Sequence, residues 1–324
     1  MSETVKAKYL ELNLDINRFI RYPILLIATL FAFIKEKPDI IFTQNPSLVL
    51  SIFAVIWGKL FNLPVVVDSH NAGLFPFEGT RKWANELADF VIRHATLTLV
   101  TNAALTDYVE TKGGKAFAVP DPIPVIEAGS KKMKLKGVYN ILFICTWAYD
   151  EPYMEVIKAA ELIDKKIYIY FTGNSRSKEK KYDRGLPGNV ILTGFLDELD
   201  YISILKSCDI IMDLTTLNDC LVCGAYEAVA AEKPLITSDT EALRNYFYKG
   251  ALYTDSTCEN ISKTILEAIS NMDNLRCQIK DLKADKIKEW DDKKNEINSI
   301  LEKFVYMKDL QKNSKLIITD KNKN

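Results

Sequence analysis

NDCLVCGAYEAVAAEKPLITSDT, residues 218–240, predicts a loop, a helix and a strand in that order. Asp219 stands in the loop, and Glu227 follows eight positions later, inside an Ala-rich run that is typical of a helix. The PLIT run that comes next is typical of a short strand. Because the helix starts just after the loop, both carboxylates can face one cleft. The stretch therefore indicates a binding or catalytic site.

Short apolar runs alternate with helical patterns on both sides of this stretch, which predicts parallel sheets covered by helices. The expected strands are AKYLELNL (7–14), DIIFTQ, PVVVDSH, LTLVTN and KAFAVP in a first series, and YNILFICT, IYIYFTG, NVILTGF, IIMDLT and PLITSDT in a second. A proline-rich segment, 119–137, separates the two series. The predicted fold class is therefore α/β with two Rossmann-like domains. The expected division is a first domain at 1–125, a linker at 126–137, a second domain at 138–273, C-terminal helices at 274–310 and a flexible tail at 311–324.

Composition limits the function further. The 324 residues include 42 Lys and Arg against 43 Asp and Glu, so a net charge of -1 disfavours nucleic acid as a partner. Six cysteines and no charged-then-apolar leader favour a reducing, cytoplasmic compartment. The most apolar segment, 23–34, is too short to span a bilayer. It is expected either as a helix buried against a sheet or as a helix docked on a membrane surface.

The ends of the expected strands are polar, and they read TQNP, DSHN, CTWAYDEP, FTGNSRS, TGFLDE and DLTTLNDC. Ligands of open parallel sheets bind beyond the carboxyl ends of the strands. These six tails are therefore where the chemistry is expected.

Taken together, these motifs resemble the two-Rossmann-domain (GT-B) glycosyltransferases, particularly family 4-like bacterial enzymes, and distantly the β-mannosyltransferase that acts on lipid-linked chitobiose. The resemblance covers about residues 37–305 and is carried by PDIIFTQNPS, VVVDSHNAG, CTWAYDEPYMEVIKAA, VILTGFL and DCLVCGAYEAVAAEKPLITSD. The last block matches the family's pattern of an acid, seven residues and Glu, with Asp219 where Glu is usual. The resemblance implies two domains facing across a cleft, with the last helix packing back toward the first domain. It also implies transfer of a hexose from a nucleotide-diphosphate donor to a glycan or lipid-linked acceptor in polysaccharide or glycoconjugate synthesis, peripherally at the inner membrane face.

By the same resemblance, Glu227 binds the ribose of the donor, since a carboxylate accepts two hydroxyl hydrogen bonds. Backbone N–H groups of 221–224 receive the diphosphate, and Gly224 allows its close approach. The base is expected near the segment after Gly194. The full set of implied donor-binding residues is Glu227, Gly224, Cys223, Thr172, Gly173, Asn174, Thr193, Gly194, Thr215, Thr216 and Trp147.

The implied catalytic residues are Asp219, which meets the transferred sugar, and Asp68 or His70, either of which could be the base of an inverting enzyme. A capping or core role for His70 stays open. The acceptor side is expected to include Asn45, Asn71 and Glu78, although Asn before Pro is more often a turn.

No metal or other cofactor is expected. Cys220 and Cys223 have the spacing of metal ligands, but no second CxxC or paired His follows, and plain packing is the simpler interpretation. Asp-x-Asp does not occur at a strand end. For Glu227 the open alternative is an ordinary solvated helix residue.

Two features depart from the family pattern. The loop after the second domain's first strand lacks the family's Arg and Lys, so charge compensation is expected from Arg176, Lys178 or a helix dipole. The leading strand and Gly-rich loop of the first domain are also missing, which predicts an exposed parallel edge for a protein partner to cover. Two alternatives therefore stay open: a truncated, non-catalytic partner of a glycosyltransferase, and a sugar-nucleotide epimerase of the same shape.

Overall fold

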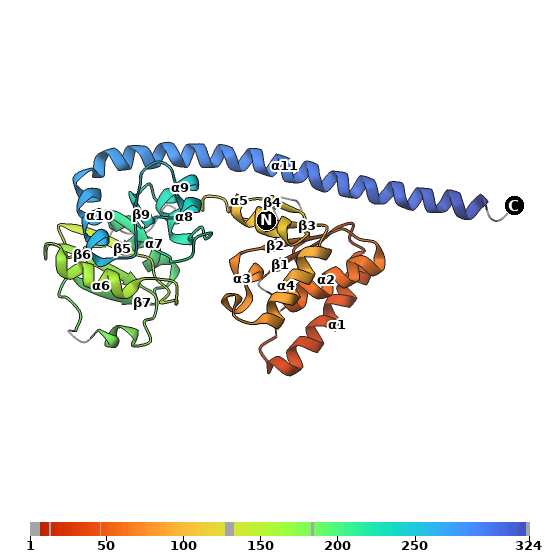
Figure 1. The fold of residues 1–324 in the computed structure, drawn as a ribbon, viewed down its shortest axis with the longest axis horizontal. Helices are drawn as coiled ribbons and strands as arrows, with labels where there is room; N and C mark the ends of the chain where they lie inside the picture. Colours follow the sequence, from red (N-terminus) through yellow and green to blue (C-terminus); the bar gives the residue numbers. More distant parts are fainter. Residues whose placement is uncertain (1–6, 13, 46, 127–132, 183–184, 322–324) are drawn as a thin grey trace. The chain divides into compact units, whose positions relative to one another are not determined.

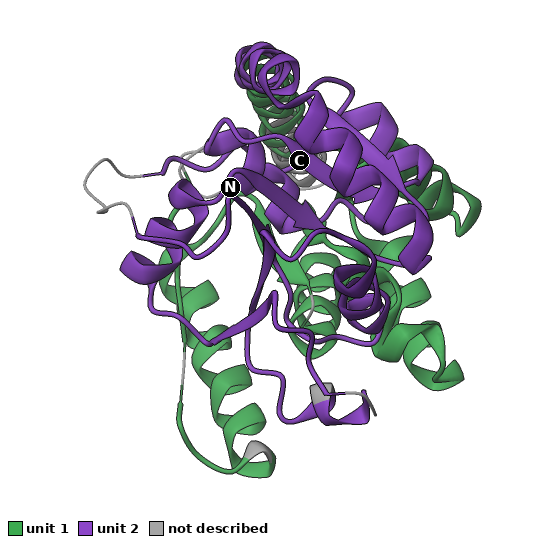
Figure 2. Cartoon of the chain, turned by 90° about the vertical axis from the view of Figure 1, so that its left-hand side faces the viewer, with its two compact units in different colours: residues 1–120, 290–324 green, residues 121–289 purple. Residues whose placement is uncertain are grey.

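The computed structural model describes residues 7–12, 14–45, 47–126, 133–182 and 185–321 (Figure 1). The chain forms two compact units, coloured separately in Figure 2. Unit 1 comprises residues 1–120 and 290–324, and unit 2 comprises residues 121–289.

Unit 1 contains a parallel sheet in the order β1-β2-β3-β4. The strands are β1 (Ile41–Asn45), β2 (Val65–Ser69), β3 (Leu97–Val100) and β4 (Ala116–Ala118). Val, Ile and Leu dominate β2 and β3 because both faces of these strands are covered. Among the described residues β1 pairs with β2 alone and so forms one edge of the sheet.

The helices of unit 1 are α1 (Arg18–Glu36), α2 (Leu48–Phe61), α3 (Asn71–Leu74), α4 (Lys82–His94) and α5 (Ala103–Thr111). Ser47 caps α2 by accepting a hydrogen bond from the Leu50 N–H, and Asn62 ends it in the left-handed conformation. Ala54, Val55 and Val91 of α2 and α4 pack on the sheet residues Ile41, Val65 and Val67. The carboxyl ends of β1 and β2 are thereby fixed side by side, with Asn45 in register with Ser69.

The predicted strand at 7–14 is wrong for the residues that the structure describes there. Residues 7–12 take no regular conformation, and residue 13 lies outside the described residues. Among the described residues β1 pairs with β2 alone, so the alternating pattern of this segment does not add a strand to the sheet. Instead, Lys8 forms an ion pair of 2.7 Å with Glu36 at the end of α1.

The apolar segment 23–34 does form a helix, as predicted, but it is not buried. Within α1, none of residues 19–36 is fully buried. No helix in the described part of the chain is long and apolar enough to cross a membrane.

Unit 2 contains a second parallel sheet, in the order β10-β9-β8-β5-β6-β7. Its strands are β5 (Tyr139–Phe143), β6 (Ile167–Thr172), β7 (Val190–Gly194), β8 (Ile210–Asp213), β9 (Leu235–Ser238) and β10 (Ala251–Thr254). Sequence reasoning found the first five and missed β10, a four-residue edge strand. The order reverses between β5 and β8, so connections diverge there and leave room for a ligand.

Helices cover both faces of this sheet: α6 (Tyr153–Leu162), α7 (Glu198–Ser207), α8 (Cys223–Ala230), α9 (Glu241–Tyr246) and α10 (Cys258–Ser270). One apolar core includes residues of α6 and α10 such as Val156, Ile157 and Ile265. The other includes Ile204 and Leu205 of α7 and Val229 of α8. Two parallel sheets with helices on their faces confirm the predicted α/β fold class.

The last helix, α11 (Met272–Lys321), has residues in both units. Leu275, Ile279 and Leu282 belong to the cores of unit 2, and Ile297 and Leu301 to a core of unit 1. The helix was expected over 274–310 with a flexible tail from 311, but it continues through Lys321. The reason is that no Gly or Pro occurs between 274 and 321 to end it.

Candidate functional site

The candidate site of unit 2 lies where the sheet order reverses, at the carboxyl ends of β5, β6 and β8. Hydrogen bonds join the loops that follow these strands. Thr215 Oγ1, after β8, donates to Asp150 Oδ2 at 2.8 Å, and the Thr216 N–H donates to the Asp150 carbonyl at 2.8 Å. The Cys145 N–H, after β5, donates to Thr172 Oγ1 at 2.8 Å. Hydrogen bonds of two buried threonines therefore tie the loops after β5 and β8 to each other and to the end of β6.

Glu151 is the centre of the loop that joins β5 to α6. Its carboxylate accepts hydrogen bonds from the Thr146 N–H at 3.0 Å, the Thr146 hydroxyl at 2.9 Å and the Ala148 N–H at 2.8 Å. The Cys145 thiol lies 3.2 Å from the same group. Two backbone donors that could bind an anion are thus already bound to a carboxylate of the chain. Sequence reasoning missed Glu151, whose only signal was an acid in a strand-end loop.

Asp150 lies just before α6 but does not cap it. The N-cap position of α6 is Pro152, which makes no side-chain cap hydrogen bond. Asp150 instead accepts from Thr215, which is 2% exposed. The Thr215 hydroxyl therefore ties two loops together and does not face solvent.

Trp147, Thr172 and Gly173 also hold loops in place. Trp147 is 2% exposed, has a φ of 62° and donates from Nε1 to the Thr172 carbonyl at 2.9 Å. Thr172 Oγ1 donates to the Cys145 carbonyl at 3.1 Å. Gly173 has a φ of 74°, and a Cβ there would lie 2.3 Å from the Cys145 oxygen, so only glycine fits. These three residues were predicted to contact the sugar donor. In the structure they are buried or closely packed and hold the loops in place.

Asp213, at the end of β8, holds the first turn of α8. Its Oδ2 accepts from the Gly224 N–H at 2.7 Å, and burial raises the pKa of this carboxyl well above its ordinary value. A Cβ at Gly224 would lie 2.5 Å from that oxygen and 2.6 Å from Ile144 Cδ1. Glycine is therefore required here by the chain's own carboxylate. The Gly224 N–H that was expected to bind a diphosphate is already engaged.

Glu227 lies half-buried on α8 and is oriented by a residue that sequence reasoning missed. The Tyr201 hydroxyl of α7 donates a hydrogen bond to Glu227 Oε2. Burial raises the pKa of Glu227, and the hydrogen bond from Tyr201 partly opposes this. Because 26 positions separate the two residues, no local motif could have revealed the pair.

The loop before α8 contains the other acid of the opening motif. Asp219 is exposed in the turn that follows Thr216, and Cys223 is exposed at the first position of α8. Burial raises the pKa of Cys220 to about 12, so its thiol stays protonated at neutral pH. In the part of the chain that the structure describes, no three His, Cys, Asp or Glu side chains gather as a metal-binding group.

The loops after β6 and β7 contain the remaining donor candidates. Thr193 Oγ1 donates to the Phe171 carbonyl at 3.1 Å, and Gly194 has a φ of 71°. Asn174 is exposed, and its Oδ1 accepts from the Arg176 N–H at 3.0 Å.

A lysine from the connection between β6 and β7 contacts the β5–α6 loop. The ammonium of Lys178 donates to the Trp147 carbonyl and lies 5.8 Å from the centre of the Tyr153 ring. Lys178 is thus one of the two residues expected to replace the missing basic pair, and it contacts the loop where that pair was expected.

In unit 1, the candidates from TQNP and DSHN lie at the carboxyl ends of the adjacent strands β1 and β2. Asn45 is 1% exposed, donates from Nδ2 to the Gly73 carbonyl at 3.3 Å and has an Oδ1 with no hydrogen-bond partner in the structure. Asp68 is half-buried at the end of β2. α3 begins at Asn71, and His70 occupies its N-cap position without a side-chain cap hydrogen bond. Glu78 is exposed on the following 3-10 turn.

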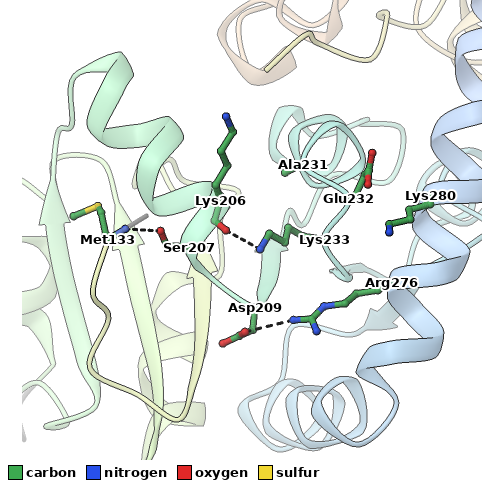
Figure 3. Close-up of a pocket in the computed structure, with 9 residues that line it drawn as sticks. All are labelled: Met133, Lys206, Ser207, Asp209, Ala231, Glu232, Lys233, Arg276 and Lys280. Carbon is green, nitrogen blue, oxygen red and sulfur yellow. Dashed lines mark hydrogen bonds and ion pairs between the residues drawn. The ribbon is translucent and has the colours of Figure 1, made fainter. Parts of the chain in front are cut away.

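A hollow of about 430 Å³ in unit 2 lies away from these residues (Figure 3). Asp209 and Lys233 precede β8 and β9, so it opens at the amino ends of the strands. Arg276 is paired with Asp209 at 3.4 Å, and Lys233 donates to the Lys206 carbonyl at 2.8 Å. The lining contains none of the candidate residues; it comprises Met133, Lys206, Ser207, Asp209, Ala231, Glu232, Lys233, Arg276 and Lys280.

Two family models match the chain in succession. Residues 14–125 match the glycosyl transferase 4-like domain, and residues 130–284 match the glycosyl transferases group 1 domain. No curated protein sequence matches the chain.

Solved structures with the same fold include sucrose-phosphate synthase from Thermosynechococcus elongatus, with a TM-score of 0.72 and 14% identity over 90% of this chain and 81% of that one. Anabaena HepE in complex with UDP-glucose has a TM-score of 0.67 and 12% identity over 85% and 82%. A putative UDP-N-acetylglucosamine 2-epimerase from Listeria monocytogenes has a TM-score of 0.56 and 14% identity over 86% and 79%.

The epimerase shows that the fold alone does not fix the reaction. The sequence matches are more specific, because both models describe glycosyl transferases and together extend from residue 14 to residue 284. The chain therefore belongs to the family 4-like glycosyltransferases of the GT-B fold.

Proposed function

We propose that this chain transfers a hexose from a nucleoside diphosphate sugar to a glycan or lipid-linked acceptor in glycoconjugate synthesis. The donor assignment rests on Glu227, which lies on α8, the helix that follows β8. Its carboxylate is half-buried and is oriented by a hydrogen bond from Tyr201 of α7. Anabaena HepE, which has this fold, is solved with UDP-glucose and with UDP. The six cysteines are all free, which supports a cytoplasmic location.

Glu227 is proposed to bind the ribose. Tyr201 donates to Oε2, so the carboxylate retains Oε1 and the second lone pair of Oε2 as acceptors for hydroxyl groups. The tyrosine fixes the rotamer of the carboxylate before the ligand arrives, which lowers the entropic cost of binding. Asp219, on the exposed turn before α8, is proposed to meet the transferred sugar.

Lys178 is proposed to compensate the charge of the leaving diphosphate. The backbone N–H groups of Thr146, Ala148 and Gly224 already bind Glu151 and Asp213, so they do not supply it. The ammonium of Lys178 lies at the same loop, and a positioned cation stabilises charge that develops on a leaving group. The proposed reaction requires neither a metal nor another cofactor.

The acceptor is proposed to bind to unit 1. The polar residues Asn45, Asp68, His70 and Asn71 lie at or just beyond the carboxyl ends of two adjacent strands. If the transfer inverts the sugar, His70 or Asp68 would take the proton of the acceptor hydroxyl.

A non-catalytic partner of a glycosyltransferase is the second candidate. Asp213 and Glu151 occupy backbone donors that would otherwise be open to phosphate, and this favours a chain that no longer binds nucleotide. The two functions differ in one measurable property, the affinity for nucleoside diphosphates.

The test is a thermal-shift titration of the purified chain with UDP, GDP and their sugar conjugates. A ligand at about 100 times its Kd adds roughly 2.7 kcal/mol to the free energy of unfolding. Glu227→Ala should reduce the affinity by roughly 1.5 to 3 kcal/mol, the scale of a hydrogen bond to a charged group. Stabilisation of wild type that Glu227→Ala abolishes would support the donor site.

No shift with any nucleotide, in a chain that unfolds cooperatively, would favour the non-catalytic partner. Release of nucleotide that depends on an added acceptor would separate a transferase from an epimerase. An unchanged affinity in folded Glu227→Ala would contradict the ribose assignment.

A further inference from the structure

The outward side of α1 exposes a continuous apolar stripe. Its residues are Ile20, Ile24, Ile27, Phe31 and Ile34, whose side chains are 43% to 66% exposed. Alternate spacings of four and three residues place all five on one side of the helix. The opposite side is anchored to unit 1, where Phe33 stacks on Phe53 of α2 with ring centres 6.1 Å apart. The stripe is therefore held outward.

The surface around the stripe is also apolar. The segment at 7–12 is placed beside the end of α1 by the Lys8–Glu36 ion pair, and it adds exposed Tyr9, Leu10 and Leu12. Of the 32 large apolar or aromatic side chains that are exposed in the described part of the chain, fifteen lie between Tyr9 and Phe61. Such a concentration on one segment marks an interaction surface, since soluble surfaces rarely expose large apolar patches.

The charges at the two ends of α1 indicate what covers this surface. No charged residue occurs between Tyr22 and Ile34, and the flanking charges are basic: Arg18, Arg21, Lys35 and Lys37. The one acid within 18–37 is Glu36, and it is already paired with Lys8. An apolar face with basic residues at its ends complements the acyl chains and phosphate groups of an anionic bilayer.

The same charges disfavour a second copy of the chain. Two α1 helices packed antiparallel would bring Arg21 of one copy near Lys35 of the other, and parallel packing would place Arg21 beside Arg21. Like charges beside an apolar contact weaken it. Because α1 exposes its apolar stripe on one side only, it would lie in the plane of the surface.

We propose that α1 binds unit 1 to an anionic membrane surface, with the isoleucine and phenylalanine stripe in the acyl boundary and the basic residues at the headgroups. The proposal does not depend on the donor or on catalysis, because it rests on α1 and residues 7–12 alone. It would bring the chain to the surface where a lipid-linked acceptor resides.

The test is flotation of the full chain with vesicles of phosphatidylcholine alone or mixed with phosphatidylglycerol. Wild type should float with the mixed vesicles, less so at high salt, since screening weakens the basic contribution. The double variant Ile27→Asp and Phe31→Asp should bind at least about tenfold more weakly, because it places charge in the acyl boundary. The matched control is Leu162→Asp, which changes an exposed leucine of α6 in unit 2 and should float like wild type.

A second variant, Lys35→Gln with Lys37→Gln, should lose binding to the mixed vesicles and flatten the salt dependence. Wild type that fails to float, or a double Asp variant that floats like wild type, would overturn the proposal. So would a dimer in light scattering that the double Asp variant abolishes without any vesicle binding, because a second copy would then cover the stripe. Nucleotide-induced stabilisation should be equal in all these variants, so failure here is distinguishable from failure of the donor site.

Discussion

Oδ2 of Asp213 accepts a hydrogen bond of 2.7 Å from the Gly224 N–H, so the end of β8 holds the first turn of α8. The N-cap residue of this helix, Val222, has no side-chain acceptor, and Asp213 supplies one from the preceding strand. Glu227 lies three residues beyond Gly224, less than one helical turn away. The direction of the Glu227 carboxylate toward Tyr201 therefore depends on a contact made at the end of the sheet.

Gly224→Ala is expected to destabilise the chain by about 1 to 3 kcal/mol, the usual cost of overpacking a core. The added methyl group would lie 2.5 Å from Asp213 Oδ2 and 2.6 Å from Ile144 Cδ1, so one of them must move. Urea unfolding measures the change, with Gly188→Ala as control because a methyl group there meets no atom within 4 Å. Equal stability of the two variants would show that α8 can shift without cost.

Asp213→Asn should flatten the pH dependence of stability. Because burial raises the pKa of Asp213 in the folded chain, its contribution to stability is present below the ordinary value of 3.8 and is lost as pH rises above it. Asparagine keeps an acceptor for the Gly224 N–H but does not ionise. The variant should therefore gain stability relative to wild type as pH rises from 3.8 toward neutral. The opposite trend in urea unfolding would mean that the ionised carboxylate is the favourable cap.

The strands of both sheets, apart from the edge strand β10, were predictable because each is a short apolar run bounded by polar residues. Val65, Val66 and Val67 are all buried, and such a run is hard to mistake. Apolar and polar residues also alternate in the segment at 7–14, but its described residues form no strand, because a strand also needs a partner with free backbone groups. That requirement is not contained in the segment itself.

The site was predictable in position but not in its contacts. Strand-end loops and Glu227 could be found from motifs, since these follow from the chain order. The partners Tyr201, Asp213 and Glu151 could not, because each acts through tertiary contacts or through a loop conformation such as the positive φ of Trp147. Residues expected to bind ligand, such as Thr215, hold the loops together.

Glu151→Ala should destabilise the chain by about 1 to 2 kcal/mol, since the Thr146 and Ala148 N–H groups lose a charged acceptor but stay partly accessible to water. The same variant should regain stability in inorganic phosphate, because the vacated N–H groups can bind an anion. Thermal unfolding in phosphate and in chloride of equal ionic strength makes the comparison. Wild type serves as the control and should respond equally to the two salts. No difference between the salts for Glu151→Ala would show that the loop does not persist without its carboxylate.

Lys178→Met should weaken the binding of a nucleoside diphosphate by about ten- to a hundredfold and leave the binding of the corresponding nucleoside nearly unchanged. The ammonium contacts the Trp147 carbonyl and lies over Tyr153, so methionine keeps the apolar stem of the side chain and removes only the charge. A cation that pairs with phosphate contributes roughly 1.5 to 3 kcal/mol. Titration calorimetry with the diphosphate and the nucleoside separates the charge effect from a general loss of binding.

The matched control is Lys180→Met, which removes an exposed lysine of the same 3-10 turn. If both variants weaken the diphosphate equally, the effect is the net charge of the turn. If only Lys178→Met does, the lysine at the β5–α6 loop replaces the basic pair that the family places there.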